Sequence, residues 1–223
     1  MSNTLVIIGA GGHGSVVAET AELMGHWRSI IFFDDHKPIG SYIHKWKIVG
    51  TTADLVRKSD QYSDFVVAIG KNSLRLAISN RLQKHNLKLV SIIHPAATVS
   101  SNCMIECGCA ILAGAVVNIG SHIGMASIVN NSATVNHDCI ISPGVHIGPN
   151  VGLGGNVSIG EQSWIGIGAN VKHRISIGSD VIVGAGAAVV SHIDNGCRVV
   201  GIPAKPLEQS QSFEQTIKRI TTA

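Results

Sequence analysis

The sequence predicts two domains, a small parallel α/β domain followed by a parallel β-helix. Within the first 95 residues, short apolar runs typical of strands alternate with segments of helical periodicity. From Val99 the pattern changes completely, because an aliphatic residue then recurs at every sixth position. A low aromatic content of 4% together with 25 glycines also favours regular, repetitive β structure.

Strands and helices alternate in the first domain. We expect strands over residues 4–8, 29–33, 65–69 and 87–93, and helices over residues 13–24, 52–57 and 73–84. A turn-rich loop separates the second strand from the second helix. Parallel strands need crossover connections of this kind, so the domain is predicted to be a small, Rossmann-like parallel sheet.

The hexapeptide repeat defines the second domain. Its sixteen positions are Val99, Ile105, Ile111, Val117, Ile123, Val129, Val135, Ile141, Ile147, Leu153, Ile159, Ile165, Val171, Ile177, Val183 and Val189. Four residues after each of them lies a small or aliphatic residue, as a second inward row requires. Three hexapeptides make one triangular coil, so residues 18 apart stack about 4.8 Å from each other. The predicted domains are residues 1–95, 96–206 and a tail at 207–223.

Composition narrows the class of function. A net charge of +3 and a pI near 8.6 fall short of a duplex-binding surface, so nucleic acid is not an expected partner. We find no apolar run long enough to span a membrane and no signal peptide, and expect a cytoplasmic protein. The 5 cysteines contain no CxxC pair, which favours reduced thiols over a disulfide framework or a zinc ribbon.

His137 is the main candidate for chemistry. It occupies neither inward row and is followed by Asp138, a carboxylate that can orient the ring or raise its basicity. Gly155 lies 18 residues on, one coil further, where it would leave an open shelf with a backbone N–H for an oxyanion. The alternative is an ordinary exposed histidine. Covalent catalysis by Cys139, two residues from His137, is an alternative to a histidine base, but the register places this thiol on an inward row.

The N-terminal domain carries a glycine-rich turn. Gly9, Gly11 and Gly14 follow a predicted strand and open a helix, with Asp34 and Asp35 at the end of the next strand. This formally satisfies the fingerprint of NAD-binding proteins. The domain is too short for two mononucleotide-binding halves, which favours half a dinucleotide, and a helix N-terminus suits a diphosphate. Glycines kept only for a tight turn are the alternative.

Five motifs resemble the hexapeptide-repeat sugar acyltransferases, the family that includes sialic acid O-acetyltransferases and UDP-4-amino-sugar N-acetyltransferases of bacillosamine synthesis. They are GAGGHG at 9–14, FFDD at 32–35, ATVNHDC at 133–139, LGGNVSIG at 153–160 and VVGIPAKP at 199–206. The resemblance covers nearly the whole chain and implies a left-handed β-helix. The tail after Pro206 departs from it, and residues 213–220 are predicted to form a short helix.

The resemblance also implies roles for individual residues. His137 is the general base, Asp138 tunes it, and Asn130 contacts the acceptor sugar. The nucleotide sugar lies beside Gly11, Gly12, His13, Asp34, Asp35 and Gly70. Acetyl-CoA, the co-substrate, lies between neighbouring β-helices of a homotrimer, beside His146, Gly155, Ile167, Ala185 and Lys205. The alternative is that the residues assigned to acetyl-CoA are ordinary wall and surface residues with no role in binding. Independently, Lys172, Arg174 and Arg198 are weak candidates for attracting phosphate.

The predicted function is acetyl-CoA-dependent N-acetylation of a nucleotide-linked amino sugar for surface glycan synthesis. O-acetylation of a sugar hydroxyl, such as that of sialic acid, is the alternative within the same family. A metalloenzyme resembling γ-type carbonic anhydrase would need a close histidine pair, and the five histidines of the repeat region are separated by 15, 9, 27 and 19 residues. We therefore expect no metal. A non-catalytic scaffold is the third hypothesis.

Overall fold

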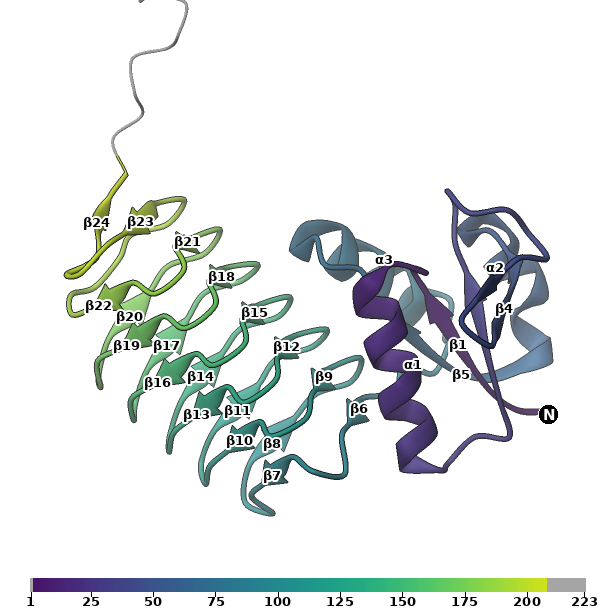
Figure 1. The fold of residues 1–223 in the computed structure, drawn as a ribbon, viewed down its shortest axis with the longest axis horizontal. Coiled ribbons are helices and arrows are strands. Elements are labelled where there is room, and N and C mark those ends of the chain that lie inside the picture. The colour runs from purple at the N-terminus through teal and green to yellow at the C-terminus, as the bar shows by residue number, and fades with distance from the viewer. Residues whose placement is uncertain (1, 208–223) are drawn as a thin grey trace, which may run out of the picture.

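A five-stranded sheet forms the N-terminal domain of the computed structural model, which describes residues 2–207 (Figure 1). The strand order is β3-β4-β2-β1-β5. The strands are β1 (Ser2–Ile8), β2 (Ser29–Phe33), β3 (Tyr42–Ile43), β4 (Trp46–Gly50) and β5 (Tyr62–Val67). The helices are α1 (Gly12–Met24), α2 (Thr52–Lys58), the 3₁₀ turn η1 (Ser59–Gln61) and α3 (Asn72–Lys84). The helix expected over residues 213–220 lies outside the described residues.

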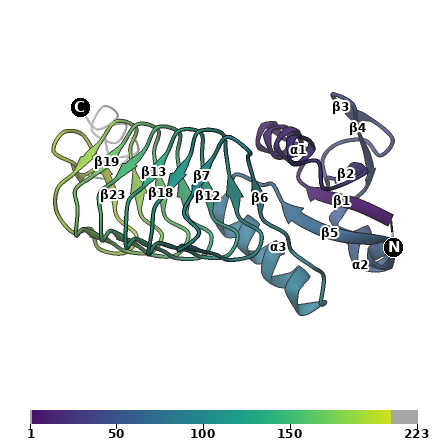
Figure 2. The ribbon, with the colours of Figure 1, turned by 90° about the horizontal axis from the view of Figure 1, so that it is seen from below.

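Helices cover both faces of this sheet (Figure 2). Side chains alternate along β1, so that Leu5 and Ile7 share a buried cluster with Val17 of α1. The neighbouring Ile8 faces the other way and shares a cluster with Leu76 of α3. The carboxyl ends of β1, β2 and β5 remain uncovered between the helices, at the edge where such sheets bind ligands.

The predicted small parallel sheet is confirmed over β1, β2, β4 and β5, and two details differ from the prediction. The turn-rich loop contains both β3 and β4. β4 pairs parallel with β2, and β3 adds one antiparallel edge strand through the pairing of Tyr42 with Lys47. A two-residue strand in a loop has too few side chains to show an alternating pattern. The strand expected over residues 87–93 contributes only a bridge from Leu89 to the sheet, and β6 (Ile92–Ile93) pairs with the β-helix. The β-helix therefore begins before residue 96.

Three parallel sheets form the triangular β-helix. The β6 sheet comprises β6, β9 (Ala110–Ile111), β12 (Ile128–Val129), β15 (His146–Ile147), β18 (Trp164–Ile165), β21 (Ile182–Val183), β23 (Arg198–Val200) and the antiparallel β24 (Lys205–Pro206). The β7 sheet comprises β7 (Thr98–Val99), β10 (Val116–Val117), β13 (Thr134–Val135), β16 (Gly152–Leu153), β19 (Asn170–Val171) and β22 (Ala188–Val189). The β8 sheet comprises β8 (Met104–Ile105), β11 (His122–Ile123), β14 (Ile140–Ile141), β17 (Ser158–Ile159) and β20 (Ser176–Ile177).

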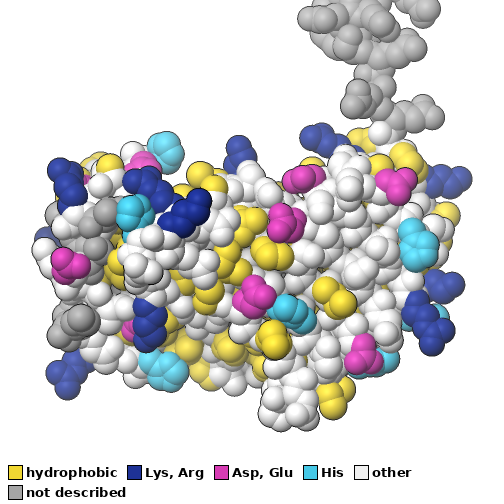
Figure 3. Space-filling model, turned by 180° about the vertical axis from the view of Figure 1, so that it is seen from behind, with side chains coloured by type: hydrophobic (Ala, Val, Ile, Leu, Met, Phe, Trp, Pro, Cys, Tyr) yellow, Lys and Arg dark blue, Asp and Glu magenta, His cyan; other side chains and the backbone are white. Residues whose placement is uncertain are grey.

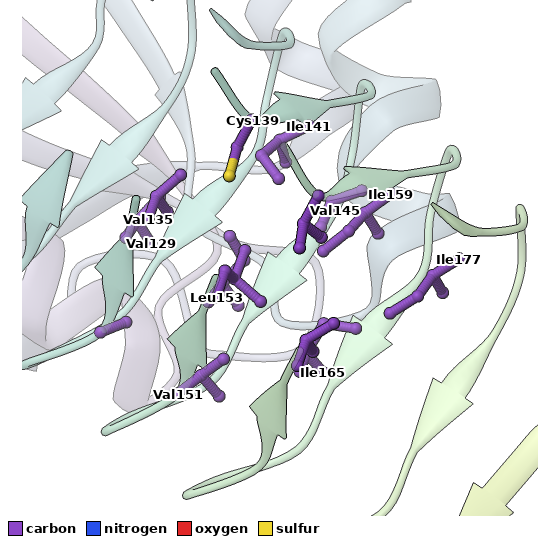
Figure 4. Close-up of a cluster of buried hydrophobic side chains, with 14 of the residues drawn as sticks. Val129, Val135, Cys139, Ile141, Val145, Val151, Leu153, Ile159, Ile165 and Ile177 are labelled. Carbon is purple, nitrogen blue, oxygen red and sulfur yellow. The ribbon is translucent and has the colours of Figure 1, made fainter. Parts of the chain in front are cut away.

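The predicted 18-residue coil is confirmed by the strand register. Val117 pairs with Val135, and Val135 with Leu153, each 18 residues further along the chain. Aliphatic side chains of all three sheets point inward to one another (Figure 4). Turns between the sheets form the corners of the triangle. The β6/β7 corner comprises residues 94–97, 112–115, 130–133, 148–151, 166–169 and 184–187, and the β7/β8 corner comprises residues 100–103, 118–121, 136–139, 154–157, 172–175 and 190–192.

Arg75 of α3 joins the two domains. Its side chain is only 1% exposed. The guanidinium donates to the carbonyl oxygens of Ala126 at 2.7 Å and Gly144 at 2.8 Å in the β-helix, and of Ile69 at 2.9 Å in the N-terminal domain. Burial lowers the pKa of Arg75 to about 10. The cation is therefore still charged at neutral pH and is neutralised by peptide dipoles rather than by a carboxylate.

Candidate active site

A cavity of about 440 Å³ opens at the carboxyl edge of the N-terminal sheet. Six residues predicted to bind the nucleotide sugar line it: Gly11, Gly12, His13, Asp34, Asp35 and Gly70. Gly14 of the same turn has a different role, because a Cβ there would collide with the carbonyl oxygen of Gly9. At Gly11 and Gly12 a Cβ would meet no atom within 4 Å. The tight-turn explanation thus fits Gly14 and leaves Gly11 and Gly12 facing open space.

The two carboxylates at the cavity rim bind groups of the protein itself. Asp34 accepts the backbone N–H of Ala10 at 2.7 Å and two further N–H groups from residues 36–37. Burial opposes ionisation of Asp34, but these three N–H donors prevail and lower its pKa. Asp35 accepts the backbone N–H and the hydroxyl of Thr52, at 2.7 and 2.6 Å. A carboxylate has about four acceptor positions, so Asp35 keeps capacity for a ligand.

The His137–Asp138 pair lies on the β7/β8 corner, outside the N-terminal cavity. His137 Nδ1 lies 2.8 Å from Asp138 Oδ2, and both side chains are 57% exposed. Since a carboxylate only accepts, Nδ1 carries the proton of the neutral ring and Nε2 is left bare. A hollow of about 250 Å³ beside the ring is lined by His137, Gly155, Asn156, His173 and Arg174. His137 therefore presents the tautomer of a general base to an open hollow.

Two glycines make room for this pair. A Cβ at Gly155 would collide with His137 Nε2 and lie 2.6 Å from Cε1, so the imidazole lies directly over the glycine. The expectation of an open shelf at Gly155 is therefore wrong, because the ring itself fills the space where a side chain would be. A Cβ at Gly120, one coil before Asp138, would likewise collide with Asp138 Oδ1. Among the described residues, the amide N–H of Gly155 has no hydrogen-bond acceptor.

The cysteines of the repeat do not face this hollow. Cys139 is fully buried, its side chain points into the β-helix (Figure 4), and its thiol donates to the carbonyl of Gly154. Burial raises the pKa of Cys139 and raises that of Cys109 to about 12. Thiols held protonated inside a core are poor nucleophiles. Within residues 2–207, no group of three His, Cys, Asp or Glu side chains is arranged to hold a metal ion.

The residues expected to contact acetyl-CoA lie on two different edges of the chain. Gly155 is on the β7/β8 corner, whereas Ile167 and Ala185 are exposed on the β6/β7 corner. His146 and Lys205 belong to strands of the β6 sheet. The structure thus brings together the residues of each corner but does not bring the two corners together within one chain.

Asn130 lies on the β6/β7 corner, and its amide nitrogen is 3.1 Å from His146 Nε2. The His146 ring stacks on Trp164 with centroids 5.3 Å apart and lies 6.5 Å from the ring of His13. His13 lines the N-terminal cavity. Asn130 therefore contacts His146, and the ring of His146 lies near His13 in the wall of the cavity predicted to bind the sugar nucleotide.

Known proteins share both domains. Residues 4–82 match the family described as the PglD N-terminal domain. The acetyltransferase domain of PglB from Neisseria gonorrhoeae FA1090, solved with acetyl coenzyme A, is 42% identical and superposes with a TM-score of 0.88, covering 93% of this chain and 100% of that one. This chain belongs to the hexapeptide-repeat sugar acyltransferase family. Its β-helix is accordingly left-handed.

Two further similar proteins are associated with nucleotide-linked amino sugars. PerB from Caulobacter crescentus, solved with CoA and GDP-perosamine, is 36% identical with a TM-score of 0.86, covering 92% of this chain and 97% of that one. A UDP-N-acetylbacillosamine N-acetyltransferase of Bacillus subtilis (strain 168) is 33% identical over 103 residues, or 45% of this chain. That match spans 47% of the Bacillus protein, so this chain matches about half the length of that curated relative.

Sequence reasoning missed three residues in or near the candidate site. His173 lines the hollow with His137 and lies two coils beyond it, so counting a second 18-residue step would have found it. Thr52 holds Asp35 and begins α2, and its position in a cavity wall depends on how the hairpin packs. Arg75 gave no sequence signal, because one arginine on a helix is normally exposed.

Proposed function

We propose that this protein is an acetyl-CoA-dependent N-acetyltransferase whose acceptor is the amino group of a nucleotide-linked sugar, either a UDP-4-amino sugar or a GDP-perosamine-like sugar. The observation that carries the proposal is the His137–Asp138 pair beside Gly155. It occurs in a chain that matches, over both domains, acetyltransferases solved with acetyl-CoA or with CoA and a nucleotide amino sugar. The product would serve surface glycan synthesis.

The chemistry is direct transfer. The amino nitrogen attacks the thioester carbonyl while His137 Nε2 removes its proton, and Asp138 stabilises the imidazolium through Nδ1. The free N–H of Gly155 donates to the oxyanion of the tetrahedral intermediate. Collapse expels the thiolate of CoA, which takes the proton back from His137 and leaves as a thiol. No acyl-cysteine is needed, in keeping with the buried Cys139.

Nucleotide binding is assigned to the N-terminal cavity. The N-terminus of α1, with Gly11 and Gly12 open to the cavity, suits a diphosphate. Asp35 suits the N–H donors of a base or the hydroxyls of a ribose. On the face shown in Figure 3, Lys and Arg side chains gather toward the two ends of the molecule rather than in one stripe. This face therefore offers no continuous basic stripe for a duplex nucleic acid.

The active site is proposed to form between copies of the chain. His137 and Gly155 occupy one corner, and Ile167 and Ala185 another, so a groove lined by both corners needs two neighbouring β-helices. A closed ring of three copies would make three equivalent grooves. Light scattering should give three times 23.4 kDa. A monomer that is fully active at assay concentration contradicts this arrangement.

Mixed assemblies test the shared site directly. His137→Ala removes the base from one corner, and Ala185→Trp obstructs the other corner of a second copy. Each variant alone should be inactive. In trimers mixed at equal amounts, about a quarter of the grooves combine two intact corners, so activity should return to about that fraction. Mixtures as inactive as the separate variants would refute a composite site.

The role of the base has its own test. His137→Ala should lower kcat by about 10²–10⁴ and leave acetyl-CoA affinity nearly unchanged. Asp138→Asn should be less damaging, because the ring remains and only its orientation and its basicity change. Near-normal turnover of His137→Ala would favour a scaffold or a cysteine nucleophile instead.

The proposed site of action is the cytoplasm, where reduced thiols persist. All five cysteines are free. In the described part of the chain, no helix has the length and apolar character needed to cross a membrane.

A further inference from the structure

Two half-buried histidines lie near each other where the N-terminal domain joins the β-helix. His13 is the second residue of α1, and His146 is the first residue of β15. Two of their ring nitrogens, Nε2 of His13 and Nδ1 of His146, are buried without a hydrogen-bond partner. A buried polar group without a partner costs about 1–3 kcal/mol, and native proteins usually satisfy such groups with ordered water.

The hydrogen bonds of Asn130 determine which nitrogen of His146 carries its proton. The backbone N–H of Asn131 donates to Asn130 Oδ1 at 2.8 Å, so the amide oxygen is on that side. The amide nitrogen therefore faces His146 Nε2, at 3.1 Å. An amide NH₂ group only donates, so Nε2 must accept and the proton of the neutral ring must be on Nδ1.

The surroundings keep both rings neutral. Burial, reinforced by the charge of Arg75, lowers the pKa of His13 to about 4. Burial, reinforced by the charge of Arg75, lowers the pKa of His146 to about 3. Stacking on Trp164, with ring planes 8° apart, holds the plane of His146. His146 is thus a fixed, neutral ring with a buried Nδ1–H donor for which residues 2–207 provide no acceptor.

We propose that one buried water molecule accepts the Nδ1–H of His146, donates to Nε2 of His13, and thereby fixes His13 as a hydrogen-bond donor to the ligand in the N-terminal cavity. With ring centroids 6.5 Å apart the two nitrogens do not bond directly, whereas a water bridge spans two bonds of about 2.9 Å each. Because His13 Nε2 then accepts, the proton of its neutral ring is on Nδ1.

The consequence is selectivity at the cavity wall. A ring held with Nδ1–H offers a donor to an oxygen acceptor, and the N-terminus of α1 beside it favours an anion. His13 is therefore a specificity-determining residue for an anionic oxygen of the ligand. Asn130 sets the tautomer of His146, and His146 in turn sets the tautomer of His13 through the water. That the ligand is a nucleoside diphosphate rests on the proposed function, but the tautomers and the water do not.

The tautomers can be read in the free protein by long-range ¹H–¹⁵N correlation spectra of histidine-labelled enzyme at neutral pH. We expect both rings to be protonated at Nδ1 and bare at Nε2. His146→Phe retains an aromatic ring against Trp164 but removes the donor, so His13 should change from one tautomer to a mixture. His122→Phe, at the same strand position on the β8 sheet, is the control and should leave His13 unchanged.

Crystallography and ligand titration complete the test. A high-resolution crystal structure should show one water within about 3.2 Å of both nitrogens. UDP and GDP should bind His146→Phe about 2–10-fold more weakly than they bind the unmodified protein. Nε2–H on His13 in the unmodified protein, an unchanged His13 in His146→Phe, or no density between the rings would overturn the proposal. A failure of the proposed function would instead appear as absent acetyl transfer with these spectra intact.

Discussion

Replacing Gly155 with alanine should displace the proposed base, His137, without changing the histidine itself. The added Cβ would collide with His137 Nε2 and lie 2.6 Å from Cε1 and 3.0 Å from Cδ2, which no small adjustment relieves. The backbone of Gly155 does not need a positive φ, so alanine fits the main chain. Since the His137 side chain is 57% exposed, the ring has free space to swing into solvent, and it would then lose its bond to Asp138.

The expected effects on activity and stability differ widely. Loss of a positioned base lowers kcat by about 10²–10⁴. Loss of one exposed hydrogen bond costs only about 0.5–1.5 kcal/mol, and at this size about 1 kcal/mol shifts Tm by about 2–4 °C. In a His137→Ala background, Gly155→Ala should therefore cost little more, because the group it displaces is already gone.

Steady-state kinetics with saturating acetyl-CoA and acceptor measure the loss, and scanning calorimetry measures Tm. Gly152→Ala is the matched control, because its Cβ would meet only the side-chain amide of the exposed Asn170, at 2.6 Å. It should retain normal turnover. If Gly155→Ala kept more than about a tenth of the original kcat, displacement of His137 would not be the reason for the glycine.

Three further predictions concern pH, the domain interface and the cavity rim. The pKa values of His13 and His146, about 4 and about 3 in the fold against 6.5 when unfolded, mean that the unfolded chain binds more protons below pH 6.5. As the pH is lowered from 6.5 to about 4, the free energy of unfolding should therefore fall by up to about 2.7 kcal/mol per pH unit. In the double variant His13→Gln, His146→Gln this contribution should be absent from the denaturation data, leaving only the slope of carboxylates such as Asp34, whose pKa is lowered in the fold. Arg75→Ala should cost about 3–5 kcal/mol in urea denaturation, because six oxygen acceptors, three of them in the β-helix, lose their donor. The exposed Arg81→Ala should change stability by under about 0.5 kcal/mol. Asp35→Ala should weaken nucleotide-sugar binding by about 1–3 kcal/mol in calorimetry and leave acetyl-CoA binding unchanged, and tight NAD binding without nucleotide-sugar binding would contradict the assignment of the cavity.

The β-helix is predictable because every coil places the same requirements on its inward residues. Each inward position must fill the same space, so the period of six shows directly, and the 18-residue step from His137 leads to Gly155, which the fold indeed places against the imidazole. The glycine fingerprint is equally readable, since it marks one local turn. What the 18-residue step does not show is whether the ring or a ligand fills the space over Gly155.

Features that depend on packing between distant segments escape prediction. The two residues of β3 are too few to carry a pattern, and the segment after Val90 leaves the N-terminal sheet because Ile92 pairs with the β-helix instead. The buried Arg75 and the pairing of His13 with His146 arise only where the two domains meet. Spacing within one domain cannot indicate a contact of that kind.

Acetyl transfer to a nucleotide-linked amino sugar is tested most directly by incubating the protein with acetyl-CoA and a panel of UDP-, GDP- and CMP-linked sugars, followed by mass spectrometry of the products. The panel should pair each amino sugar with its hydroxyl counterpart, and His137→Ala serves as the inactive control. We predict that one nucleotide-linked amino sugar gains a single acetyl group on nitrogen, and that its hydroxyl counterpart does not react. Acetylation of hydroxyl groups alone, or transfer to no member of the panel by a protein that binds acetyl-CoA, would contradict the account.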